Sequence, residues 1–332
     1  MVEKTERVAY LDILRVLSAL AVITIHVVAY EFYCLFGQST WWWTVFLDGL
    51  AHWAVPLFVM ISGSLFLDPK RKVNNKKLFR KKIPHLLFLY CFWWVVYFFL
   101  LVAIGIKPFT LASLLKPSVH LWFLPMLIGL YLIVPFLRLF MNNKRLVRYY
   151  LLLWFAFSTF ELLPIVPRFT NAFLMSFVMK YSGYFVLGYY LSSSQFTRKQ
   201  NRLVYLLGLL SSFVIVVGTI LKSQYDGQQS IEFMELLTPQ YMFLSSAIFL
   251  YVKNHSRHCK PQTLRVVGFL QKYTLGIYLV HSFWISFLAT DTVRHCCSVY
   301  ITLPVIIIAI AIVSFLTVVV LQKIPLLKKT VQ

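Results

Sequence analysis

Ten long apolar stretches follow one another along the chain, separated by short polar segments. A hydrophobic run of about 20 residues is long enough to cross the hydrocarbon core of a bilayer as a helix. The stretches cover residues 10–32, 44–67, 83–105, 118–140, 147–163, 172–192, 203–221, 234–252, 267–289 and 300–322. No intervening segment is long enough to build a separate core. The pattern predicts an all-α, polytopic membrane protein of about ten transmembrane helices, with residues 1–332 forming a single integral-membrane domain.

Lys and Arg gather in every second segment between these stretches. The segments after the second, fourth, sixth and eighth stretches hold the basic runs, and the two ends of the chain add further Lys and Arg. The other segments carry only scattered charges. Cytoplasmic loops of membrane proteins are enriched in Lys and Arg. We therefore expect both termini on the cytoplasmic side of a bacterial inner membrane.

Composition agrees with a membrane protein and disfavours other classes. The chain is 60% hydrophobic and 13% charged, whereas soluble domains are closer to half apolar and a quarter charged. A net charge of +21 is also found in nucleic-acid-binding proteins, but here the basic residues lie where membrane topology requires them, so we expect no nucleic-acid partner. The five cysteines show no CxxC or Cys/His ligand spacing, so we expect no metal site.

Three ionisable residues share one face of the first predicted helix. Arg15 and His26 are 11 residues apart, almost three whole helical turns, which places them about 16 Å apart along the axis. Asp12 precedes Arg15 by three residues and lies on the same face. Ionisable groups inside a membrane are costly and usually face the bundle interior, where they serve a function. A snorkelling pair explains Asp12 and Arg15 alone equally well, but the complete stripe favours a functional site.

The second predicted helix carries two further polar pairs. Asp48 and His52 are four residues apart, so the carboxylate is placed to orient the imidazole, and an ion pair at the outer interface without chemistry is the alternative. Ser62 and Gly63 allow another helix to approach closely, which is ordinary membrane packing, or admit a ligand near the cytoplasmic mouth.

Later polar residues leave two explanations open in the same way. The basic run from Lys70 to Lys82 is either an anchor on anionic lipid or a rim that binds phosphate. His120 and Trp122 begin the fourth helix, where Trp is common at the membrane interface. Tyr278 and His281, three residues apart on the ninth helix, share a face near the middle of the membrane.

Several of these residues belong to stretches that resemble a known family. The stretches are LDILR at 11–15 followed by His26, VPLFVMISGSLF at 55–66, KKLFRKKIP at 76–84, HLWFLP at 120–125 and LGIYLVH at 275–281. In this order they resemble the acyltransferase 3 family, and the match covers nearly the whole chain. The likeness is greatest to its short stand-alone polysaccharide O-acetyltransferases.

The resemblance implies transfer of an acetyl group from cytoplasmic acetyl-CoA to a hydroxyl of a cell-surface or lipid-linked glycan. The expected catalytic residues are His26 and Arg15, which match the essential histidine and its paired arginine, together with Asp12 and His281. The expected acetyl-CoA contacts are Lys77, Arg80, Lys81, Ser62 and Gly63. Lys77 and Arg80 match two basic residues spaced three apart, although the first is Lys here rather than Arg. The expected acceptor contacts are Asp48, His52, His120, Trp122 and Tyr278.

The residues fit this chemistry but also fit other classes. A histidine near neutral pH can act as a general base or carry the acyl group, and Arg15 can stabilise the oxyanion or position the donor. The alternative is a transporter of a small polar solute or lipid-linked sugar, because buried ionisable residues also line transport paths. A membrane scaffold without a substrate is the third possibility. The sequence does not distinguish acetyl from succinyl, and it does not identify the acceptor.

Overall fold

The computed structural model describes residues 8–160, 173–294 and 296–332, and within these ranges the regular structure is entirely helical. Lys4 and Arg7, which contribute to the predicted orientation of the N-terminus, lie outside them. The longer helices are α1 (Ala9–Cys34), α2 (Trp41–Gly49), α3 (Ala54–Phe66), α5 (Ile83–Ala103), α7 (Phe123–Leu132), α9 (Lys144–Phe160), α10 (Phe173–Ser193), α11 (Arg198–Asp226), α12 (Pro239–His255), α13 (Pro261–Leu270), α14 (Thr274–Leu288) and α16 (Val299–Lys323). The short ones are α4 (Asn75–Lys77), α6 (Leu111–Leu114), α8 (Val134–Arg138) and α15 (Asp291–Arg294).

Five helical segments in the described part of the chain are long and apolar enough to cross a membrane. They are Ala9–Cys34, Trp41–Phe66, Asn75–Ala103, Arg198–Asp226 and Val299–Lys323. Two apolar segments, His120–Leu132 and Thr274–Leu288, are shorter. The expectation of an all-α, multi-pass membrane protein is therefore confirmed, while the count of ten spans stays a prediction. The second predicted span is divided between α2 and α3, with a turn at 50–53 between them.

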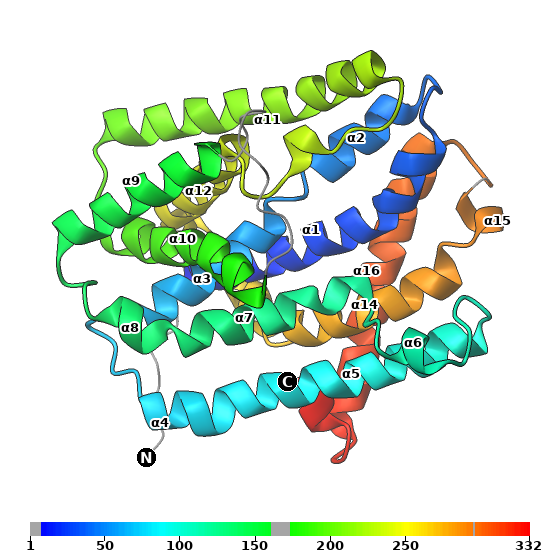
Figure 1. Cartoon of the computed structure of the whole chain (residues 1–332), viewed down its shortest axis with the longest axis horizontal. Helices are drawn as coiled ribbons and strands as arrows, with labels where there is room; N and C mark the ends of the chain where they lie inside the picture. Colours follow the sequence, from blue (N-terminus) through cyan, green and yellow to red (C-terminus); the bar gives the residue numbers. More distant parts are fainter. Residues whose placement is uncertain (1–7, 161–172, 295) are drawn as a thin grey trace.

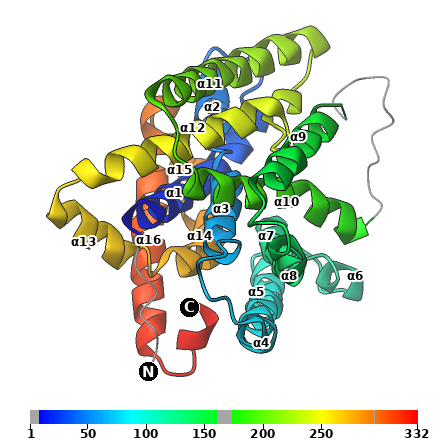
Figure 2. The ribbon, with the colours of Figure 1, turned by 90° about the vertical axis from the view of Figure 1, so that its left-hand side faces the viewer.

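Helix α1 lies at the centre of the bundle. It packs against α2, α3, α12, α14 and α16, and Figures 1 and 2 show it surrounded by other helices in both views. Helices α1 and α14 run in the same direction, because Arg15 contacts Gln271 just before α14 while His26, further along α1, contacts His281 further along α14. This parallel pair carries the polar stripe predicted from the sequence.

Two glycines bring α3 and α10 into backbone contact. A Cβ atom on Gly63 would collide with the backbone of Phe185, and one on Gly188 would collide with the backbone of Met60. Small residues at such crossings let membrane helices approach closely and gain van der Waals contact. The contact fixes the position of α3 against α10.

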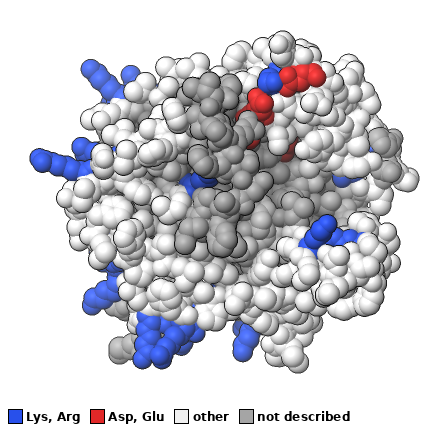
Figure 3. Space-filling model, in the orientation of Figure 1, with Lys and Arg blue, Asp and Glu red and all other residues white. Residues whose placement is uncertain are grey.

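The basic residues on the face shown in Figure 3 gather mainly along one edge of the molecule, where Figure 1 places α4, α8 and the start of α9. Some of these cations also hold the chain together. Arg138 donates to the carbonyl oxygens of Phe66, Asp68 and Arg71 at 2.7, 3.0 and 3.1 Å. These carbonyls follow or end α3, where helix geometry leaves them without partners.

A buried ion pair joins the C-terminal end of α1 to α15. Arg294 donates to the Glu31 carboxylate at 2.9 Å, and the two side chains are only 4% and 3% exposed. Arg294 also donates to the carbonyl oxygens of Ala289 and Val27 at 2.7 and 3.2 Å. This arginine, one of the scattered charges between apolar stretches, therefore ties the end of α14 to α1.

Candidate active site

A cavity of about 370 Å³ opens between α1, α3, α5, α7 and α14. Its wall combines apolar side chains, mostly Phe and Leu, with polar ones that include Arg15, Ser62, Tyr131, Thr274 and Tyr278. It adjoins the basic start of α5, with Lys82 and His85 in its wall. We call it the basic-side cavity.

Arg15 is fixed in this cavity by partners from two segments. Its Nη1 donates to Asp12 Oδ1 and to Gln271 Oε1, each at 3.3 Å. The Arg15 side chain is 28% exposed while that of Asp12 is 4% exposed, so the carboxylate is enclosed and the guanidinium reaches the cavity. Ser62 is hydrogen-bonded to Tyr131, and the Tyr131 ring lies near enough to Arg15 to interact with its charge. These neighbours orient the Arg15 guanidinium, which still has N–H donors available to a ligand.

The basic run reaches the cavity through Lys82, its last residue, and the following His85. Lys82 and His85 line the wall, and the Lys82 ammonium lies 4.5 Å from the centre of the Phe66 ring. Lys77, Arg80 and Lys81 are exposed on α4 and the following turn and are not among the lining residues, so their contact with acetyl-CoA stays a prediction.

A π-helical turn over Leu78–Lys82 explains why Lys82 lines the cavity while Lys77 and Arg80 do not. Pro84 lacks a backbone N–H and its ring crowds the carbonyl four residues earlier, so a regular α-helix is disfavoured there. The wider turn absorbs the conflict, and π-turns of this kind are frequent at functional sites. Ser62 lines the cavity, whereas Gly63 packs against α10, and the contact of either residue with acetyl-CoA stays a prediction.

Three histidines from different segments meet at the far end of the polar stripe. The ring centre of His26 lies 4.9 Å from that of His281 and 6.2 Å from that of His120, and the last two are 5.4 Å apart. His281 and His120 are 0% and 4% exposed. His120 lies in the turn before α7, so this cluster joins residues that are distant in the sequence.

The hydrogen bonds of these rings fix where their reactive nitrogens are. His26 Nδ1 lies 2.8 Å from the Val22 carbonyl oxygen, and His281 Nδ1 lies 2.6 Å from that of Tyr278. A carbonyl oxygen only accepts, so Nδ1 carries the hydrogen in both rings and the neutral ring keeps its lone pair on Nε2. Buried His120 Nε2 has no hydrogen-bond partner among the described residues. No group of metal-ligating side chains is assembled in the described ranges.

Tyr278 connects the cavity with the histidines. Its side chain lines the basic-side cavity, and its hydroxyl donates to the carbonyl oxygen of His120. The Tyr97 ring packs against His120 with the ring centres 4.6 Å apart. Trp122, by contrast, packs against Tyr181 of α10 and is not a lining residue of either cavity described here.

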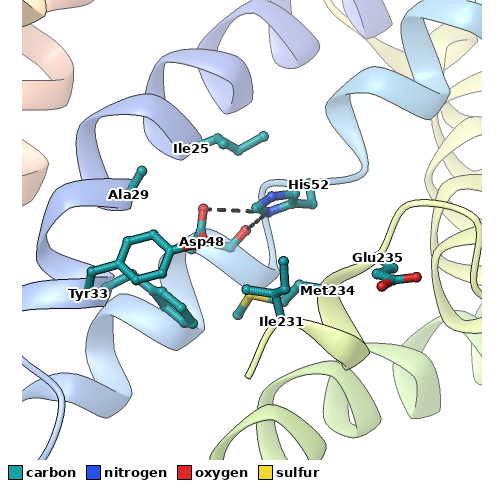
Figure 4. A pocket seen from close by; sticks show the side chains of 9 residues that line it. Ile25, Ala29, Tyr33, Asp48, His52, Ile231, Met234 and Glu235 are labelled. Atoms are coloured by element: carbon teal, nitrogen blue, oxygen red, sulfur yellow. Dashed lines mark hydrogen bonds and ion pairs between the residues drawn. The ribbon is translucent and has the colours of Figure 1, made fainter. Parts of the chain in front are cut away.

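A second cavity, of about 180 Å³, lies against the later part of α1 and does not include His26 in its wall. Its wall includes Ile25 of α1, Asp48 of α2, His52 and Glu235. Figure 4 shows Asp48 and His52 together, with Glu235 apart from them beyond Met234. His52 Nδ1 lies 2.8 Å from the Asp48 carbonyl oxygen and 3.5 Å from its carboxylate. We call this space the outer pocket. The sequence pairs Asp48 with His52 correctly but gives no signal for Glu235.

The described helices thus bring three histidines together in a bundle whose central helix lines two cavities. Residues 8–323 match the acyltransferase domain that defines the acyltransferase 3 family. The chain belongs to this family and is a membrane acyltransferase, as its resemblance implied. Searches of curated proteins and of solved structures found no match.

Proposed function

We propose that the protein transfers an acetyl group from acetyl-CoA to a hydroxyl of a cell-surface or lipid-linked glycan in a bacterial inner membrane. The observation that carries the proposal is the position of His26. It packs against His281 inside the bundle, and its helix lines the basic-side cavity through Arg15 and the outer pocket through Ile25 and Ala29. Donor and acceptor would then both bind against the helix that carries this imidazole.

The basic-side cavity suits the donor. Arg15 and Lys82 supply positive charge, and Arg and Lys are the residues that pair with phosphate oxygens. The apolar part of the wall, formed by residues such as Phe58, Phe123 and Leu127, suits an extended acyl-bearing arm. A thioester carried past Tyr278 would arrive beside the histidine cluster.

His26 then serves as the general base. Its Nε2 takes the proton of the acceptor hydroxyl as the hydroxyl oxygen attacks the thioester carbonyl carbon. The carbon–sulfur bond breaks, the proton passes to the departing thiolate, and the products are the acetyl ester and free CoA. The bond from Nδ1 to Val22 holds the ring in the tautomer that this step needs. His281 packs against His26 and maintains its orientation.

The test is a His26→Ala variant assayed for surface-glycan acetylation by mass spectrometry and, after purification, for release of CoA from acetyl-CoA. Loss of a general base should reduce the rate by roughly 10²- to 10⁴-fold. His255→Ala is the matched control, because His255 makes the same 2.8 Å bond to the carbonyl four residues earlier but is exposed at the end of α12. Undiminished acetylation at normal membrane levels would exclude His26 from the mechanism.

The same preparation tests the transporter alternative. Proteoliposomes that take up a glycan precursor without acetyl-CoA, and that leave the thioester intact when it is added, would favour transport over transfer. His281→Ala, assayed in parallel, ranks the second histidine: a positioning role predicts a smaller loss than in His26→Ala.

A further inference from the structure

The outer pocket contains a buried hydrogen-bond acceptor that lacks a donor. Asp48 is 6% exposed, and its Oδ1 has no hydrogen-bond partner among the described residues. His52 Nδ1 is 3.5 Å from this oxygen and is already bonded to the Asp48 carbonyl oxygen at 2.8 Å. A buried polar atom left in this state costs free energy of about 1–3 kcal/mol, or more for a charged group, so it requires an explanation.

The pocket around this oxygen has a definite chemistry. Its volume of about 180 Å³ is on the scale of one sugar ring rather than a chain of rings. Ile231, Met234 and Phe32 line it with apolar groups, which suit the C–H face of a sugar. An ionised carboxylate only accepts hydrogen bonds. A hydroxyl satisfies it, whereas a carboxylate or phosphate on the ligand would add acceptors and repulsion.

The pocket also lies within reach of the proposed base. Ile25 and Ala29, which flank His26 in α1, both line it. His26 itself is not a lining residue, and its ring contacts those of His281 and His120. A sugar ring seated against Asp48 therefore lies beside the turn of α1 that carries His26.

We infer that the outer pocket is the acceptor subsite and that it selects an uncharged sugar residue. Asp48 Oδ1 accepts a hydrogen bond from one hydroxyl of the ring, and another hydroxyl of the same ring is presented to His26. Asp48 is thus a specificity-determining residue. This inference rests on the proposed function for the role of the bound sugar, but binding itself is independent of acyl chemistry.

The experiment measures binding without acetyl-CoA. Purified protein is titrated with a panel of neutral methyl hexosides and the matching methyl uronides, and binding is followed by saturation-transfer NMR. We expect at least one neutral hexoside to bind, with its uronide at least about tenfold weaker. In Asp48→Asn the neutral sugar should bind roughly tenfold or more weakly, because a hydrogen bond to a charged acceptor is lost, and the uronide penalty should shrink.

Two further variants keep the result decisive. Asp226→Asn, at the end of α11 and paired with Lys222, is the control and should bind like the parent protein. Ala29→Leu fills the pocket without altering Asp48 and should abolish binding. Equal affinity for hexoside and uronide, or an affinity unchanged in Asp48→Asn, would overturn the inference. So would the absence of hexoside binding, which would mean that only water occupies the pocket.

CoA release with the same sugars separates this inference from the proposed function. Asp48-dependent binding without CoA release would leave the subsite standing and remove the transferase role. CoA release that depends on His26 but is unchanged in Asp48→Asn would support the transferase role and remove the subsite.

Discussion

Replacing Arg294 by methionine tests how the bundle holds its catalytic helices together. The guanidinium is 4% exposed and donates to Glu31 at 2.9 Å, to the Ala289 carbonyl oxygen at 2.7 Å and to the Val27 carbonyl oxygen at 3.2 Å. It also lies 4.7 Å from the centre of the Tyr30 ring. Methionine fills much of the same volume but makes none of these bonds, and it leaves the Glu31 carboxylate buried without its cation.

The magnitude follows from that uncompensated charge. Removing one partner of a buried ion pair typically costs about 3–5 kcal/mol of the free energy of unfolding, and we expect Arg294→Met to fall in this range. Replacing Glu31 by Gln in the same chain removes the orphaned charge, so the double variant should recover part of the loss, and the two substitutions should not be additive.

Denaturant unfolding of the detergent-solubilised protein, followed by tryptophan fluorescence, measures the effect. Lys222→Met breaks an exposed pair with Asp226 and serves as the control, for which we expect little change because exposed pairs are screened by water. Transferase activity at low temperature should fall as well, because the pair anchors α14 and hence His281 beside α1. Equal unfolding midpoints for Arg294→Met and Lys222→Met would refute the reasoning, as would additive effects in the double variant.

Three other substitutions give direct tests. Arg15→Lys keeps the charge but not the planar fork, so the KM for acetyl-CoA should rise about tenfold or more, and an unchanged KM in CoA-release assays would contradict a donor-binding role. Gly63→Ala places a methyl group on the Phe185 backbone and should destabilise the bundle by about 1–3 kcal/mol or more, read as a lower unfolding midpoint. Arg138→Met removes the donors that hold residues 66–71 and should speed hydrogen exchange in that segment; unchanged exchange there would argue against the clamp.

The polar stripe of α1 was predictable because it depends only on helical periodicity. Asp12 and Arg15 form the expected pair, Arg15 lines the basic-side cavity, and His26 packs against His281 inside the bundle. The number of residues between two helix positions decides whether they share a face. Because an ionisable group exposed to lipid is costly, the face that carries such groups turns to the bundle interior.

Contacts between helices were harder to predict, because no local pattern encodes them. His120 and His281 were separate candidates in the sequence, and only the packing of α14 against the turn before α7 brings both beside His26. Glu235 and Gln271 lie near the starts of the predicted stretches 234–252 and 267–289, where no spacing with another polar residue marks them. Gly63 was ambiguous for a similar reason, since a small residue suits both a ligand and a neighbouring helix.

Pro84 has an effect on how the basic segment can evolve. Because the π-turn shifts the angular phase of the helix, the cation of this segment that reaches the cavity is Lys82, two residues beyond Arg80. A substitution that restored regular winding would rotate a different side chain toward the interior without changing any charge. One imino acid thus decides which cation of the basic run lines the cavity.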